Sequence, residues 1–305
     1  MIIKLSNDLK KEEMWANGTE LASIMGKDRK NGRRVLTYPL TEKQFVYSFN
    51  NPVLLTDNYR IAKLKPRLRD SIFSLLANRP RIVTYDNVSV FWDHSHINVW
   101  CPSIDTLLFA NALRRLVKRN SNFRTAAEIG CGSGFLSKYI LTKNKNIKSM
   151  LVNDLNPYAI KCAMDNIKDH RAVFYTGDGL KKIHGHKFDL LICNPPYVPR
   201  PNSIDDNPYE GVGLLNHLLH EGQKYLNKGG VIITNISSLC ENIVLKNKTK
   251  MKLNVLEEMR VPLKVNNIVN NKKWINHLKK LGLVNKYKEG YDYWHTIKII
   301  MLENK

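Results

Sequence analysis

The most specific chemical feature of the sequence is a run of four residues behind a short apolar segment: Asn194, Pro195, Pro196 and Tyr197. Proline lacks the N–H that a sheet requires, so the pair ends a strand and leaves carbonyl oxygens free to accept hydrogen bonds. The Asn194 side chain adds one more acceptor, and the Tyr197 ring adds a flat face. These groups together suit a planar amino group.

The nitrogen of an amide or aromatic amine is a poor nucleophile because its lone pair is delocalised. Acceptors that receive its hydrogens and aim the lone pair at an electrophile favour the transition state over the ground state. Group transfer by in-line displacement depends on alignment, so positioning supplies much of its rate. The run 194–197 therefore predicts catalysis of group transfer to a planar nitrogen. The alternative interpretation is a simple turn.

A glycine-rich segment lies upstream, between a predicted strand and a predicted helix. Its acid is Glu128, and its glycines are Gly130, Gly132 and Gly134. Such glycines let the chain turn tightly and approach a ligand closely. The spacing GxGxG is one residue shorter than the dinucleotide fingerprint GxGxxG.

Two acids end the next two predicted strands. Asp154 lies 20 residues after Gly134, where a carboxylate is placed to accept hydrogen bonds from both hydroxyls of a ribose. Asp178 is predicted to contact an adenine amino group, and its alternative role is that of a turn residue before Gly179. Because dinucleotide-binding proteins also place an acid like Asp154, the loop and this acid alone do not decide the cofactor.

Alternating elements must position these residues. Predicted helices at 107–117, 136–141, 156–168 and 212–226 alternate with predicted strands at 126–129, 149–154, 172–175, 188–193 and 231–235. Residues 261–265, 274–278 and 291–296 predict a strand, an inserted helix and a final strand. The alternation predicts an α/β fold with a doubly wound, mostly parallel sheet. Ligands of such sheets lie at the carboxyl ends of the strands.

The first third of the chain is predicted to be organised differently. Residues 1–81 are interpreted as an N-terminal domain with helices at 7–25 and 67–78. The β-prone runs 82–85, 88–91 and 97–100 form a linker over 82–102, and the main domain takes 103–305.

The formal net charge of +21 is concentrated in the two flanks of the sequence, at 26–81 and after 241. This distribution indicates a surface that meets a polyanion such as RNA or a ribosome. The alternative is a set of solvated lysine-rich faces, because a composition rich in Lys, Asn and Ile raises the pI without any selection for binding.

The remaining composition excludes several classes. The cysteines are far apart and form no CxxC pair, which fits neither a disulfide framework nor a zinc site, and no metal is predicted; they are Cys101, Cys131, Cys162, Cys193 and Cys240. The sequence contains no run of 18 apolar residues, so no membrane span is predicted. The N-terminus does not resemble a signal peptide. A cytoplasmic protein with reduced thiols is expected.

The loop, the acids and the 194–197 run resemble class I S-adenosylmethionine-dependent methyltransferases, over about 82–235. The NPPY run is similar to that of the release-factor glutamine methyltransferases (HemK-type) and the N6-adenine methyltransferases. The resemblance implies S-adenosylmethionine as cofactor, a seven-stranded sheet and a small, mainly helical N-terminal domain for substrate recognition. The resemblance also implies which residues bind the cofactor: Glu128, Gly130, Gly132, Gly134, Asp154, Asp178 and Asn194.

Two further stretches resemble the glutamine-modifying group. Residues 101–108 resemble its Pro-x-x-(Asp/Glu)-Thr segment, which implies that Asp105 and Thr106 lie beside the cofactor; a helix start is the alternative. Residues 210–214 resemble its Gly-rich turn after NPPY. The chain departs from that group at Glu128, where Asp is usual, and after Pro102, where Ser103 replaces Arg. His295 is predicted to be a packed histidine on the last strand rather than a base.

Three functions remain open. The first is N-methylation of a glutamine side-chain amide in a translation-related protein, favoured by the stretches 102–108 and 210–214. The second is N-methylation of an exocyclic base amine in rRNA, tRNA or DNA, favoured by the basic flanks. The third is an inactive methyltransferase fold that binds nucleic acid, and the intact 194–197 run counts against it. The expected partner is a protein or RNA of the translation apparatus.

Overall fold

A computed structural model describes residues 26–27, 34–35, 81–92, 96–119, 122–201, 211–246, 251–263, 266–288 and 291–304. Of the predicted N-terminal domain it describes only the pair β1 (Gly26–Lys27) and β2 (Arg34–Val35) and the first residue of β3. The helices predicted at 7–25 and 67–78 lie outside the described residues, and so does Glu210.

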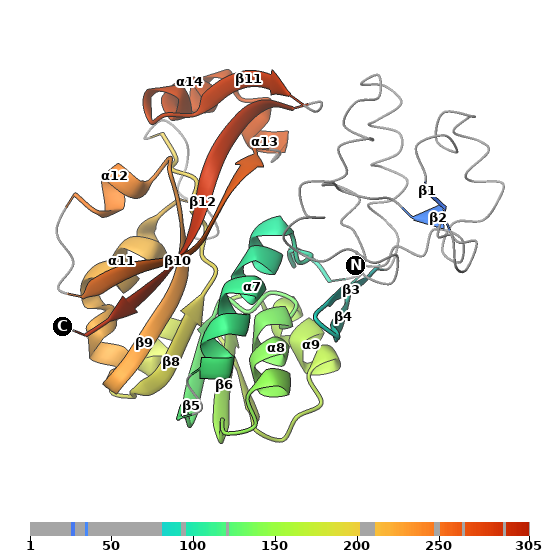
Figure 1. Cartoon of the computed structure of the whole chain (residues 1–305), viewed down its shortest axis with the longest axis vertical. Coiled ribbons are helices and arrows are strands. Elements are labelled where there is room, and N and C mark those ends of the chain that lie inside the picture. The colour runs from blue at the N-terminus through green and yellow to red at the C-terminus, as the bar shows by residue number, and fades with distance from the viewer. Residues whose placement is uncertain are drawn as a thin grey trace.

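A central sheet with helices on both faces organises the described chain (Figure 1). Its strand path is β10-β12-β9-β8-β5-β6-β7, and β11 pairs with β12 off this path. Neighbours from β9 to β7 are parallel, whereas β12 runs antiparallel to β9 and β10. The strands are β5 (Thr125–Ile129), β6 (Ser149–Asp154), β7 (Ala172–Thr176), β8 (Phe188–Cys193), β9 (Leu226–Ser237), β10 (Lys252–Pro262), β11 (Val284–Lys288) and β12 (Tyr291–Glu303). The predicted doubly wound fold is confirmed, and β11 adds an eighth strand to the predicted seven.

Helices cover the two faces through separate apolar cores. One core joins the sheet to α7, α8 and α9, and it contains Phe109, Tyr139 and Ile140. The other joins the opposite face to α11, through Leu215 and Leu218. The helices are α7 (Ile104–Arg119), α8 (Phe135–Lys143), α9 (Pro157–Asn166), α10 (Gly179–Ile183), α11 (Gly213–Glu221), the 3-10 turn η2 (Gly222–Tyr225), α12 (Glu241–Val244), α13 (Asn266–Val269) and α14 (Lys272–Lys280). None of the described helices is long and apolar enough to cross a membrane.

The strand order reverses beside β5, because the chain continues to β6 and β7 on one side and returns to β8 and β9 on the other. The last residue of β5, Ile129, pairs with the last residue of β8, Cys193. The glycine loop after β5 and the 194–197 run after β8 therefore leave the sheet side by side, at the switch point where α/β sheets bind ligands.

Two of the three β-prone runs form a hairpin of β3 (Arg81–Tyr85) and β4 (Val88–Trp92). This hairpin packs on the main domain, since Val83 and Val90 join the core of α7 and α8. The strand predicted at 97–100 is wrong. Asn98 adopts a left-handed φ of 56° and the Val99 N–H donates to the His96 carbonyl, so the chain turns there.

The boundary predicted between a helix at 212–226 and a strand at 231–235 also differs. Helix α11 ends at Glu221, and β9 already begins at Leu226. Gly222 lies so close to β9 that an added Cβ would meet the Ile232 side chain at 2.3 Å. Sheet packing, rather than the local sequence, decides where this helix ends.

Gly134 precedes α8 with a φ of 77° and packs directly on α9. A Cβ there would lie 2.9 Å from the Ala163 Cβ and 3.0 Å from the Ile167 Cδ1. Gly134→Ala should therefore lower the free energy of unfolding by about 2–4 kcal/mol, from backbone strain and overpacking together. Urea unfolding monitored by circular dichroism measures the change.

Gly130→Ala is the matched control, because a Cβ at Gly130 meets no atom within 4 Å although its φ is 74°. Only the strain remains, at about 1–2 kcal/mol. Equal destabilisation by the two substitutions would contradict the packing explanation.

Candidate active site

The glycine loop leaves β5 and enters α8 through three left-handed glycines, with φ of 74°, 52° and 77° at Gly130, Gly132 and Gly134. The Cys131 N–H donates to the Asn153 carbonyl at 2.8 Å, which ties the loop to β6. Because nothing lies within 4 Å of a Cβ built on Gly130, the loop forms an open cradle at the carboxyl edge of the sheet.

Asp154, at the end of β6, braces this loop. One carboxylate oxygen accepts the Gly132 N–H at 2.9 Å, and the other accepts the Asn156 N–H at 2.9 Å. Burial raises the pKa of Asp154, and the backbone N–H groups oppose that shift. Each carboxylate oxygen can accept further hydrogen bonds, so Asp154 can both hold the loop and receive hydroxyl groups of a ligand.

Glu128 lies beneath the loop and is only 1% exposed. Its Oε2 accepts the backbone N–H of Ser137 at 2.9 Å and also the Ser137 hydroxyl. Burial raises the pKa of Glu128 to about 8. The carboxyl group thus anchors the first turn of α8, and its contact with a cofactor stays a prediction.

Asp178 is the N-cap of α10. Its Oδ1 accepts the Leu180 N–H at 3.0 Å and the Lys181 N–H at 3.4 Å. The turn role considered for this residue is therefore present in the structure. The predicted contact of Asp178 with an adenine remains a prediction, for which its other oxygen is the candidate.

Asn194 connects the run after β8 with the start of α7. Its Nδ2 donates to Asp105 Oδ2 at 3.3 Å, while its Oδ1 is buried without a partner. Asp105 also accepts the Ser103 hydroxyl, and the Ser103 N–H donates to Thr106 Oγ1 at 3.2 Å. Asp105 and Thr106 therefore lie in the first turn of α7, the helix start that was the alternative, and Asp105 at the same time contacts the predicted catalytic run.

Tyr197 packs against His295 of β12, with ring centroids 6.0 Å apart. Ser237 Oγ accepts the Leu239 N–H at 3.1 Å and shares a hydrogen bond with His295 Nδ1 at 2.9 Å. Burial lowers the pKa of His295 to about 4, so His295 is neutral and packed, as predicted.

Asn235 was missed by the sequence reasoning. It is fully buried in β9, and neither its Oδ1 nor its Nδ2 has a partner. Because Cys193 pairs with Thr234 in the parallel register, Asn194 and Asn235 come next on neighbouring strands. A polar residue within the apolar run 231–236 was the available signal, but strand pairing was needed to place it beside Asn194.

A family described as "Methyltransferase small domain" has a model that matches residues 104–261, more than half of the chain. The chain belongs to this family. The methyltransferase is 31% identical over 189 residues to a protein of Methanocaldococcus jannaschii that is named provisionally as a protein N5-glutamine methyltransferase. That match covers 57% of this chain and 92% of the archaeal protein.

Two bacterial relatives match shorter stretches of the methyltransferase. Release factor glutamine methyltransferase of Aquifex aeolicus is 27% identical over 150 residues, which are 43% of this chain and 53% of that protein. Ribosomal RNA small subunit methyltransferase C of Buchnera aphidicola is 27% identical over 124 residues, which are 40% of this chain and 36% of that protein. The chain thus spans about half or less of the length of these two relatives.

The predicted enzyme class and cofactor are confirmed: the protein is a class I S-adenosylmethionine-dependent methyltransferase. The structure fits this cofactor at two points. Gly130 leaves open space where a ligand can approach the backbone, and Asp154 presents its carboxylate at the end of the next strand. At the end of the neighbouring strand β8, Asn194 presents a further polar group, its unpartnered Oδ1.

Replacing Asp154 by alanine should weaken S-adenosylmethionine binding about 100-fold, because hydrogen bonds to a charged acceptor contribute about 1.5–3 kcal/mol each. Isothermal titration calorimetry measures the affinity. Asp169→Ala is a control that removes a carboxylate engaged with Arg171. Wild-type affinity in the Asp154 variant would contradict the predicted role.

Glu128→Gln should change how stability depends on pH. Burial holds the pKa of Glu128 near 8 in the folded protein. Between about pH 4.5 and 8 the unfolded chain has therefore released this proton and the folded chain retains it. The stability that protonated Glu128 contributes is complete at low pH and declines as pH rises toward 8.

Gln mimics the protonated acid and does not titrate. The free energy of unfolding of the wild type should thus fall relative to that of the variant by roughly 1.4 kcal/mol per pH unit across this window. Guanidinium unfolding at pH 5, 6, 7 and 8 measures it. Parallel pH curves for the two proteins would show that Glu128 is ionised in the folded state.

Proposed function

We propose that this methyltransferase methylates the side-chain amide nitrogen of a glutamine in a protein of the translation apparatus. The names of the M. jannaschii and A. aeolicus relatives support glutamine as the acceptor. The observation that carries the proposal is the Asn194 side chain, which combines a partner on its nitrogen with a buried, unpartnered oxygen.

The proposed cofactor site lies across the edge formed by β5, β6 and β7. Gly130, Gly132 and Gly134 let the backbone approach the ligand, Asp154 receives its ribose hydroxyls, and Glu128 keeps α8 in place. The proposal assigns Asp178, Asp105 and Thr106 to the rim of the same site. When bound, S-adenosylmethionine supplies a methyl group on a positively charged sulfur.

The orientation of the Asn194 amide follows from electrostatics. Its Nδ2 donates to the Asp105 carboxylate, and the reversed amide would place two oxygens against each other. Oδ1 is therefore the atom left to accept an N–H of the substrate amide, and a carbonyl of the Pro195–Pro196 pair would accept the second hydrogen. The two hydrogen bonds would fix the nitrogen lone pair in line with the methyl group.

Tyr197 would provide the flat wall of this acceptor pocket. Its ring is held by the neutral His295, which is itself held by Ser237. Burial raises the pKa of the Tyr197 hydroxyl well above its ordinary value, so the phenol stays neutral. With a pKa near 4 and its Nδ1 engaged, His295 is suited to hold this wall rather than to take a proton.

The second candidate acceptor is an exocyclic amine of an RNA base. It presents the same planar NH2 group, so the groups proposed for glutamine would also bind it. The name of the B. aphidicola relative favours this candidate. The two candidates therefore differ in the molecule that carries the NH2 group, and the reaction is the same for both.

Asn194→Ala should leave S-adenosylmethionine binding intact and reduce kcat by about 10²–10³-fold, the loss typical when one preorganised polar group is removed. Calorimetry measures cofactor binding, and transfer of a tritiated methyl group measures turnover. Pro199→Ala, two residues beyond the run, serves as a control for general disturbance of the loop. Full activity of the Asn194 variant would exclude Asn194 as the acceptor-binding group.

The acceptor itself is identified with a lysate from a strain that lacks the gene. Label that protease releases, together with N5-methylglutamine in the peptides by mass spectrometry, is the expected result. Label that only nuclease releases would overturn the glutamine proposal in favour of a base amine.

A further inference from the structure

A small module is inserted between β10 and β12 and consists of α13, α14 and β11 (Figure 1). Its buried apolar residues form a separate cluster with Leu239 and Leu263 of the main domain; they are Ile268, Trp274, Ile275, Leu278 and Leu283. All three large apolar residues of α14 belong to this cluster and are at most 4% exposed. The opposite face of α14 is consequently polar and free of large apolar side chains.

The module is attached directly to the loop that follows the NPPY run. The Trp274 indole N–H donates to the Pro199 carbonyl at 2.8 Å. The Arg200 guanidinium lies over the Trp274 ring, 5.5 Å from its centroid, and Val198 packs against the apolar cluster. The module that carries α14 is therefore fastened to the loop beside the residues that would receive the methyl acceptor.

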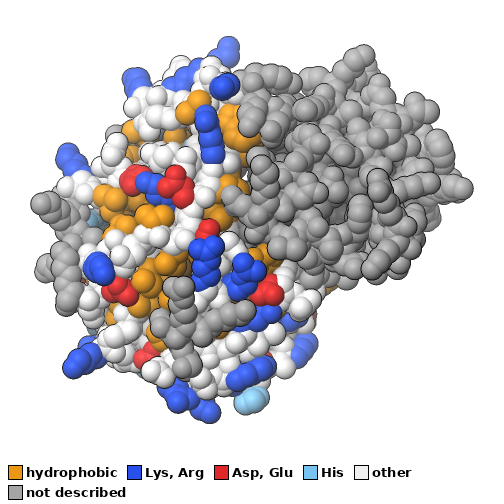
Figure 2. Space-filling view, viewed as in Figure 1, with side chains coloured by type: hydrophobic (Ala, Val, Ile, Leu, Met, Phe, Trp, Pro, Cys, Tyr) orange, Lys and Arg blue, Asp and Glu red, His pale blue; other side chains and the backbone are white. Residues whose placement is uncertain are grey.

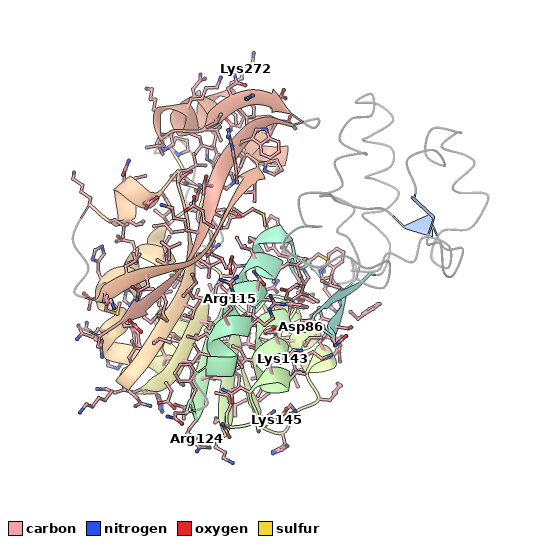
Figure 3. The ribbon with its side chains drawn as sticks, viewed as in Figure 1. Asp86, Arg115, Arg124, Lys143, Lys145 and Lys272 are labelled. Carbon is pink, nitrogen blue, oxygen red and sulfur yellow. The ribbon has the colours of Figure 1, made fainter. Side chains whose placement is uncertain are left out.

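The outward face of the module is strongly basic. From Lys264 to Lys288 the sequence has seven lysines and no acid. In the described part of the chain no α14 lysine forms an ion pair. Figure 2 shows blue side chains over this end of the molecule, and Figure 3 labels Lys272 there. We name this face the α14 surface; its exposed residues are Lys272, Lys273, Asn276, Lys279, Lys280 and Lys286.

We propose that the α14 surface binds the phosphate backbone of RNA and thereby brings an RNA-associated substrate to the NPPY loop. The lysine pairs at 272–273 and 279–280 lie seven residues apart, so about 10 Å of helix separates them on nearly the same face. Lysines at this separation can neutralise successive phosphates, and the Asn276 amide between them can donate to a phosphate oxygen.

Two observations favour RNA over other anionic partners. A helix that lies in a membrane surface needs an exposed apolar face, whereas the apolar residues of α14 are buried inside the module. Lysine is depleted in protein–protein interfaces, which argues against an acidic protein. The inference goes beyond the proposed function, because a ribosomal protein bound to rRNA and an RNA base would both be presented in this way.

The test compares two full-length variants with equal loss of charge. The first carries Lys272→Gln, Lys273→Gln, Lys279→Gln and Lys280→Gln. The control carries Lys145→Gln, Lys148→Gln, Lys187→Gln and Lys228→Gln, all exposed residues near the opposite end of the parallel strands. Anisotropy of a fluorescein-labelled 20-nucleotide RNA hairpin is measured from 50 to about 200 mM salt, conditions over which phosphate contacts are lost.

The α14 variant should bind the hairpin about 10–100-fold more weakly and reduce the salt slope by about 2–3, since each lost phosphate contact removes about 0.7–0.9. The control should stay within about 3-fold of the wild type. Both should keep wild-type S-adenosylmethionine affinity and thermal stability. Because no methyl acceptor is used, failure here is separate from failure of the glutamine proposal.

Three results would overturn the inference. The first is wild-type RNA affinity in the α14 variant, and the second is an equal loss in the two variants. The third is stronger binding of wild type to polyglutamate or to vesicles with 30% phosphatidylserine than to the hairpin, with the difference abolished in the α14 variant; that result would assign the surface to an acidic protein or a membrane.

Discussion

The parallel pairing of β5 with β8 is the constraint on which the candidate site depends. Ile129 and Cys193 are partners at the ends of these strands, so the two segments that follow must leave the sheet together. One is the glycine loop and the other is the NPPY run, although about 60 residues separate them in sequence. A slip of one residue would turn every side chain of a strand to the opposite face. The buried apolar residues of both faces hold this register.

Polar side chains at this edge are mostly used to support the backbone. Glu128 holds α8, Asp154 holds the glycine loop, and Asp105 holds the Asn194 amide. Buried polar groups without partners are costly and uncommon. The unpartnered amide oxygens of Asn194 and Asn235 therefore stand out, and their neighbouring strands place both at the proposed acceptor pocket. The same edge continues through Pro199 to Trp274, which connects the pocket with the α14 surface.

Much of this site was predictable because it depends on short-range chemistry. Three glycines before a helix, an acid at a strand end and a proline pair after a strand each restrict the chain through its nearest neighbours. Those signals located the switch-point edge and the order of its parts. The strand predicted at 97–100 was wrong because a long-range contact overrides the local β preference. The Asn156 amide, which follows β6, donates to the Ile97 carbonyl and holds these residues in a turn.

The sequence by itself therefore determined the α/β alternation, the glycine loop, Asp154 and the NPPY run. Tertiary structure alone decided that Asn194 donates to Asp105 and that Asn235 lies beside Asn194. It also decided that the inserted helix is fastened by Trp274 to the loop after Tyr197. Local preferences follow from adjacent residues, whereas these contacts join positions 40 to 90 residues apart and exist only once strand register and helix packing are set.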